Sequence, residues 1–162
     1  FRTLLTKAKE AKIDALVTVA QTPVTNAFTV KQAKELGLDV QIYGTDTIDG
    51  PDFFGTAKDA AEGVKQIVVT EDPSRKGWEA FKEAVPAFQS SPVFPAYGYD
   101  AANIVANGIA KVGYDGTALK DYLYGMSNFK GLASDIKFDE KGDNNVPAAV
   151  KVARGGKFVL EK

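Results

Sequence analysis

The spacing of apolar residues along the first part of the chain alternates between helix and strand. Residues 1–12 place apolar side chains on one helical face and mostly lysines on the other, which predicts an amphipathic helix. Residues 15–20 are a nearly continuous apolar run, typical of a strand covered on both faces. A second helix, residues 22–37, and a second strand, residues 40–43, repeat this order. The alternation predicts parallel strands joined by right-handed crossovers.

The second helix carries start and stop signals. Thr22 suits the N-cap position and Pro23 the first helical position, and Gly37 suits the C-terminal end. The alternating pattern then continues with a helix at 51–61, a strand at 64–70 and a helix at 73–85.

The pattern changes near residue 90. Two serines and two prolines in residues 90–95 break the alternation, which favours a connection between two lobes. A helix is expected from Tyr99, with Asp100 as a possible cap, and another at 117–126, with no strand between them. The alternating pattern therefore predicts no sheet for these two helices to cover.

The last part of the chain reads as strands. Apolar and polar residues alternate over 134–139, which predicts a half-buried strand. Residues 150–160 suggest a hairpin that turns at Gly155-Gly156.

Composition narrows the function classes. The 162 residues include 20 basic and 21 acidic ones, so no basic field favours nucleic acid. The absence of cysteine and histidine excludes thiol nucleophiles, disulfides, Ser-His arrangements and the usual zinc sites. No apolar run approaches the roughly 20 residues that span a bilayer. Because helical spacing is already present at Phe1, we expect the true N-terminus of the protein to lie elsewhere.

Polar side chains follow the first two predicted strands. Asp46 comes after the second strand and Gln21 after the first. The carboxyl ends of parallel strands are where α/β folds collect ligands, so both are candidate ligand-binding residues. The alternatives are that Asp46 forms a turn and that Gln21 caps the helix at Pro23. A catalytic pair of carboxylates, Asp46 and Asp49, is a weaker hypothesis, because no base, nucleophile or metal ligand accompanies the pair.

An acidic turn at residues 139–143 invites a calcium interpretation. It lacks the ligand spacing and the closing glutamate of the twelve-residue calcium loop. We therefore expect neither a metal nor a cofactor.

Several short strings together resemble the type I periplasmic binding proteins, and within them the leucine/isoleucine/valine-binding branch that serves ABC importers. Each string is weak alone, but their order and spacing are kept over nearly the whole chain. The strings are Phe1–Leu5, Ile13–Ala15, Lys31–Leu38, Tyr43–Asp46, Ala61–Val64, Tyr99–Ala101 and Phe138–Asp143.

The resemblance implies an α/β fold in which two lobes trap a ligand between them. Residues 1–89 would be most of the C-terminal lobe, a three-layer structure around a parallel sheet. Residues 90–131 would hold an interlobe crossing and two helices of the N-terminal lobe, and residues 132–162 would return to the first lobe with a β-hairpin. On this assignment, the sheet missing under the two helices belongs to the N-terminal lobe.

The resemblance also implies a site and a function. In amino-acid-binding members an acidic residue after the second strand accepts the ligand's α-ammonium group, and Asp46 holds that position. Gln21 stands where leucine binders often have an aromatic residue, which speaks against a purely aliphatic ligand. Thr22, Thr45 and Thr47 are further candidates for the wall of the site.

The expected function is non-catalytic: capture of an amino acid, such as a branched-chain one, or a similar small solute for the membrane permease of an ABC importer. The place of action would be periplasmic or otherwise extracytoplasmic, with a lipid anchor if the source is Gram-positive. The alternative is a sensory or regulatory ligand-binding domain of the same fold. The apolar stripe of Ile104, Val105 and Ile109 also suggests self-association.

Overall fold

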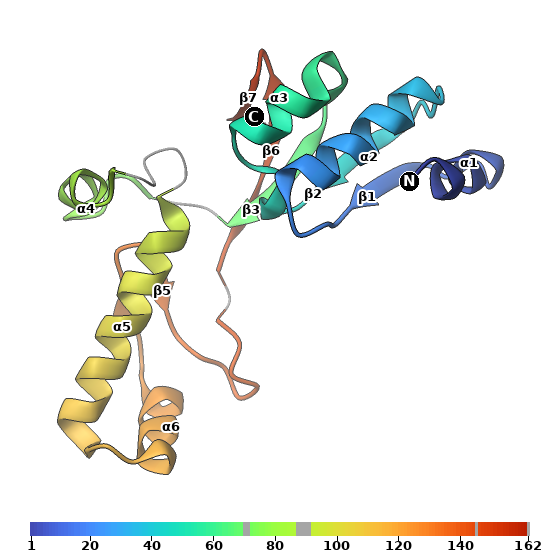
Figure 1. Cartoon of the computed structure of the whole chain (residues 1–162). Helices are drawn as coiled ribbons and strands as arrows, with labels where there is room; N and C mark the ends of the chain where they lie inside the picture. The colour runs from blue at the N-terminus through green and yellow to red at the C-terminus, as the bar shows by residue number, and fades with distance from the viewer. Residues whose placement is uncertain (70–71, 87–91, 145, 162) are drawn as a thin grey trace. The chain divides into compact units, whose positions relative to one another are not determined.

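The computed structural model describes residues 1–69, 72–86, 92–144 and 146–161, which form two compact units (Figure 1). Unit 1 combines Phe1–Val69 with Ala148–Lys162, and unit 2 is Thr70–Pro147. The predicted domain boundary between residues 89 and 90 lies outside the described residues. The assignment of the three segments to two lobes stays a prediction.

Unit 1 is built on a five-stranded sheet in the order β1-β2-β3-β6-β7. The first three strands are parallel, and β6 and β7 are antiparallel to their neighbours. The predicted α/β architecture with a C-terminal hairpin is therefore confirmed. Its elements are α1 (Arg2–Glu10), β1 (Ala15–Thr18), α2 (Pro23–Glu35), β2 (Gln41–Gly44), the 3₁₀ turn η1 (Asp46–Ile48), α3 (Pro51–Ala57), η2 (Lys58–Ala61), β3 (Lys65–Val69), β6 (Ala148–Arg154) and β7 (Lys157–Leu160).

The core of unit 1 lies between the helices and the sheet. Helix α2 contributes Ala27, Val30 and Ala33, each with no exposed surface, and these join Ile42 of β2 and Phe53 of α3 in one apolar cluster. Burial of these side chains is the main term that holds the strands and helices together. The cluster thereby holds in place the ends of β1 and β2, which the candidate residues Gln21 and Asp46 follow.

Helix α1 is only partly buried, which corrects the prediction from its spacing. Leu5 is buried in the core cluster, whereas the side chains of Phe1 and Leu4 are exposed. Helical spacing predicted the helix itself correctly, but it did not identify which of its apolar residues the unit covers.

The described part of unit 2 contains three helices and a small hairpin. Its elements are α4 (Trp78–Ala84), α5 (Val93–Val112), α6 (Gly116–Gly125), β4 (Phe129–Lys130) and β5 (Asp135–Ile136). The strand predicted over 134–139 is thus limited to two residues, and β4, its antiparallel partner, was not predicted. Trp78 lies buried among Ala96 and Ala133 as the centre of a second, smaller core.

Two helix starts differ from the prediction. Helix α5 begins at Val93 rather than Tyr99, because Pro95 falls in the first turn, where a missing N–H costs nothing. Asp100 is therefore not a cap but lies inside the helix, 1% exposed. Helix α4 begins at Trp78 rather than residue 73, since the preceding residues form a turn in which the Asp72 carboxylate accepts from the Ser74 amide.

Helix α6 packs against α5 at Gly108, next to the apolar stripe. Gly108 allows close approach, because an added Cβ would lie 2.9 Å from a ring carbon of Tyr122. Ile104 is buried, while Val105 remains 40% exposed. Self-association through this stripe stays a prediction, and its apolar surface is smaller than the sequence suggested.

Candidate functional site

The two strands that precede the candidate residues end side by side. β1 and β2 are parallel, and their last residues, Thr18 and Gly44, are register partners. Gln21 and Asp46 follow these strands by three and two residues, and both side chains are exposed. The loops that carry the two residues therefore leave the same edge of the sheet. This is where open α/β sheets offer room for a ligand.

Asp46 starts η1, which turns the chain from β2 towards α3. Gly44 makes this turn possible, because a Cβ there would come within 2.6 Å of the buried Ile48 side chain. No hydrogen bond or ion pair involves the Asp46 carboxylate within the part of the chain that the structure describes. By contrast, the neighbouring Asp49 carboxylate accepts from the Gly50 amide at 2.9 Å. Asp46 itself lies in a turn, because its carbonyl accepts from the Asp49 amide at 3.1 Å, but its carboxylate takes no part in that hydrogen bond.

The threonines of the site differ in what their hydroxyls do. Thr22 caps α2, since its hydroxyl accepts from the Thr25 amide at 3.2 Å. The N-cap prediction is confirmed, and the alternative that Gln21 caps this helix is wrong. Thr45 and Thr47 flank Asp46, and their hydroxyl oxygens lie 3.0 Å apart.

A fully buried amide, Asn26 of α2, connects the two loops, and the sequence reasoning missed it. Its side chain hydrogen-bonds backbone groups of Ala20 and Thr22, and it reaches the Thr47 hydroxyl across 21 residues of sequence. The available signal was its position: Asn26 interrupts the apolar stripe that Val30 and Ala33 continue on α2.

The chemistry open to this site is recognition of a cation by an unpaired carboxylate. An ammonium group provides three donors and a positive charge, so it suits Asp46 and the adjacent hydroxyls. In the described residues, no group of three or more His, Cys, Asp or Glu side chains is placed to hold a metal ion.

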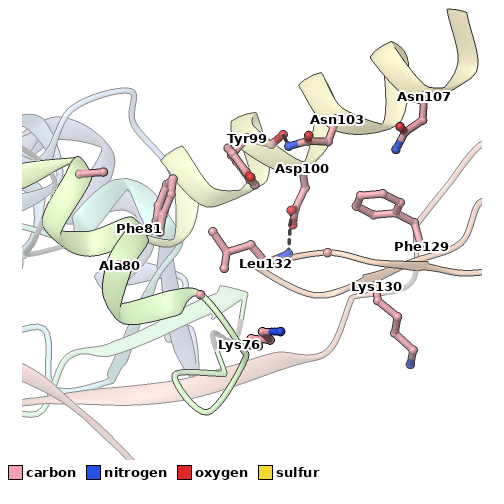
Figure 2. Close-up of a pocket in the computed structure, with 13 residues that line it drawn as sticks. Lys76, Ala80, Phe81, Tyr99, Asp100, Asn103, Asn107, Phe129, Lys130 and Leu132 are labelled. Atoms are coloured by element: carbon pink, nitrogen blue, oxygen red, sulfur yellow. Dashed lines mark hydrogen bonds between the residues drawn. The ribbon is translucent and has the colours of Figure 1, made fainter. Parts of the chain in front are cut away.

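Unit 2 has an open pocket of about 550 Å³ between α4, α5 and β4 (Figure 2). Phe81 and Tyr99 form an aromatic pair in it, with ring centroids 5.7 Å apart. Among the described residues that line it, the acidic one is Asp100, which points at the loop after β4 and accepts from the Leu132 and Ala133 amides at 2.7 and 2.8 Å. The Asp100 carboxylate is therefore already hydrogen-bonded to backbone amides of its own unit, whereas the Asp46 carboxylate has no such partner among the described residues.

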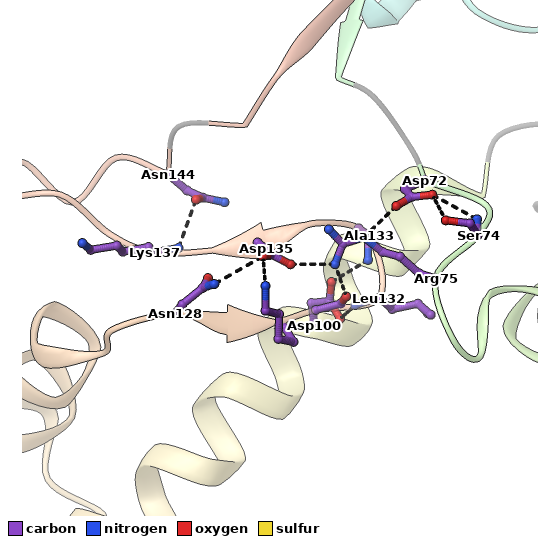
Figure 3. A network of polar contacts seen from close by, with 12 residues as sticks. Asp72, Ser74, Arg75, Asp100, Asn128, Leu132, Ala133, Asp135, Lys137 and Asn144 are labelled. Atoms are coloured by element: carbon purple, nitrogen blue, oxygen red, sulfur yellow. Dashed lines mark hydrogen bonds and ion pairs between the residues drawn. The ribbon is translucent and has the colours of Figure 1, made fainter.

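A polar network lies next to this pocket (Figure 3). Arg75 donates to the Gly131 carbonyl at 2.9 Å and to the Asp135 carboxylate at 2.8 Å. Hydrogen bonds from Lys130, Arg75 and Asn128 keep the pKa of Asp135 far below its usual range. The network joins the turn before α4 to the β4–β5 hairpin. Its positive groups, Arg75 and Lys130, pair with the Asp135 carboxylate, which indicates a structural role.

Among the described residues, no helix combines the length and the apolar character that crossing a membrane requires.

Known proteins resemble the chain in both sequence and structure. The leucine-, isoleucine-, valine-, threonine-, and alanine-binding protein of Pseudomonas aeruginosa is 27% identical over 148 residues, covering 88% of this chain and 39% of that protein. A leucine binding protein from Thermotoga maritima has a TM-score of 0.83 at 23% identity, covering 100% of this chain and 47% of the other. That identity supports the fold alone.

A branched-chain amino acid transporter substrate binding protein from Streptococcus pneumoniae, solved in complex with isoleucine, has a TM-score of 0.74 at 26% identity. It covers 98% of this chain and 46% of its own. The chain thus spans less than half the length of the proteins named here. Residues 1–157 match the family described as periplasmic binding protein. The observed fold agrees with this family match, and the chain therefore belongs to the periplasmic binding protein family.

Proposed function

We propose that this chain is part of the solute-binding component of an ABC importer and that it captures a free amino acid. The observation that carries the proposal is the Asp46 carboxylate, exposed at the edge of the sheet and without a partner in the described residues. A desolvated ammonium group needs a charge-assisted acceptor, and Asp46 supplies one.

Relatives support the ligand class. The Pseudomonas protein is named for five amino acids, and the Streptococcus protein was solved with isoleucine. Gln21 offers an amide where the resemblance implies an aromatic residue in leucine binders. We therefore propose a ligand side chain that is small or partly polar rather than purely aliphatic. Threonine and alanine, both in the name of the Pseudomonas protein, fit this description.

The mechanism is binding without catalysis. Because the chain covers 39% of its Pseudomonas relative, the remaining contacts to the ligand are expected from the rest of the full-length protein. A ligand that touches two lobes favours the closed state by its higher affinity for that state. The closed protein would then deliver the solute to the permease outside the cytoplasm. On this proposal the 162-residue chain alone binds amino acids weakly, since it offers one wall of the site.

Thermal unfolding of the full-length protein with a panel of free amino acids tests the proposal. A ligand present at about 100 times its Kd stabilises the folded state by about 3 kcal/mol and raises the Tm by several degrees. We expect at least one amino acid to do so, and its decarboxylated amine not to. If every amino acid leaves the Tm unchanged while a solute without an amino group raises it, the proposed ligand class is wrong.

A further inference from the structure

We infer that Asn26 is a positioning residue of the ligand site, joining the loop after β1 to η1 so that Gln21 and Asp46 face the ligand from fixed places. The inference rests on the proposed function. Its structural part, the joining of the two loops, can be measured without any ligand.

The hydrogen bonds fix the orientation of the Asn26 amide. Its Oδ1 accepts from the Ala20 amide at 3.0 Å and from the Thr18 hydroxyl at 2.8 Å. Its Nδ2 donates to the carbonyls of Ala20 and Thr22, both at 3.0 Å. A backbone N–H can only donate and a carbonyl can only accept, so the reversed amide would oppose like groups at three contacts. The whole path from Ala20 to Thr22 is thereby held to α2.

The same amide reaches the other loop. Nδ2 lies 3.3 Å from the Thr47 hydroxyl, which in turn lies 3.0 Å from the Thr45 hydroxyl. Two amide hydrogens serve three acceptors here, and the Thr47 contact is the longest of them. Asp46 lies between the two threonines in the sequence, so the residues on both sides of it take part in this chain of polar contacts.

Packing alone does not account for an asparagine at this position. Asn26 is completely buried on the face of α2 that Val30 and Ala33 also occupy. Burying an amide is unfavourable unless every polar atom finds a partner, and an apolar side chain would avoid that cost. What the amide adds is a hydrogen-bonded connection between the loop after β1 and η1.

Asn26→Asp is the sharpest test, because it keeps the size and replaces Nδ2 with an oxygen opposite two carbonyls. In the full-length protein we expect about a 10-fold loss of affinity for the amino acid that gives the largest rise in Tm in the panel. We also expect faster hydrogen–deuterium exchange in residues 19–22 and 45–48. Thr18→Val removes one bond to Oδ1 without changing the shape, and should act in the same direction with a smaller effect.

Thr29→Val is the matched control. Thr29 is also buried on α2, but the one hydrogen bond of its hydroxyl within the described residues goes to the Thr25 carbonyl of its own helix, at 3.2 Å. It should change neither the affinity nor exchange in the two loops, even where it lowers the Tm. A common loss of stability would affect Tm in both variants, so affinity and loop exchange separate positioning from a merely structural role.

The outcomes separate the inference from the proposed function. Looser loops with weaker binding in Asn26→Asp, and neither in Thr29→Val, support the inference. Looser loops with unchanged affinity overturn it and leave the proposed function standing. If the wild-type protein binds no amino acid, the proposed function fails, and exchange in the two loops alone decides whether Asn26 joins them. Should Asn26→Asp fail to fold, Thr18→Val decides by the same two readouts.

Discussion

Replacing Asp46 with asparagine is expected to lower the affinity of the full-length protein for its amino acid at least 100-fold. The substitution keeps the shape of the side chain and removes its charge. An enclosed ammonium group then loses its counter-ion, a defect that costs about 3–5 kcal/mol when one partner of a buried pair is removed. Since each 1.4 kcal/mol is a factor of ten, calorimetric titration will resolve the change easily.

Asp39→Asn is the control for this experiment. Asp39 is also exposed, but it precedes β2 and thus lies at the opposite end of the strand from Asp46. Its replacement changes the net charge equally and should leave the affinity within about twofold, because a single distant surface charge contributes little at physiological ionic strength. Equal losses in both variants would show that overall charge, rather than contact with Asp46, determines binding.

Asp100→Asn is expected to destabilise unit 2 by about 3 kcal/mol. The Asp100 carboxylate is 1% exposed and accepts from two consecutive amides, those of Leu132 and Ala133. An asparagine can accept from one of them but points its own N–H groups at the other. Gly131 lies directly against this carboxylate: a Cβ there would come within 2.8 Å of the Asp100 carboxyl carbon and within 2.6 Å of the Ser134 carbonyl oxygen. The loop therefore has no room to relax around the defect.

Urea unfolding of the 162-residue chain measures this effect, with Asp121→Asn as the comparison. The Asp121 side chain on α6 is 68% exposed, and its partner among the residues that the structure describes is Lys120, in a surface ion pair. Its loss should cost under about 1 kcal/mol. If the two variants unfold at the same urea concentration, the loop after β4 is not held by Asp100 in the way described.

Local signals in the sequence predicted local structure well. Thr22 and Pro23 start α2 as expected, and Gly155-Gly156 turns the β6–β7 hairpin with both residues at positive φ. These features depend on a few consecutive residues, so they can be read without knowing the fold. The parallel direction of β1, β2 and β3 could also be predicted, because the helices between these strands act as crossover connections.

Contacts between distant residues could not be predicted in this way. The sequence offers Asp100 as a possible helix cap, yet its partners lie 32 and 33 residues further on. Asn26 looked like an ordinary helix residue, although it meets Thr47 of a separate loop. In both cases the residue type allows several roles, and only the packing of elements from different parts of the chain selects one.

Comparing two ligands of the wild-type full-length protein shows directly whether the site recognises an ammonium group. One is the amino acid that stabilises it, and the other is the matching α-hydroxy acid, in which a neutral hydroxyl replaces the ammonium group. Calorimetric titration should give at least 100-fold weaker binding of the hydroxy acid, and Asp46→Asn should reduce that preference to under about tenfold. Equal affinities of the wild-type protein for the two ligands would contradict the account, because Asp46 would then recognise no ammonium group.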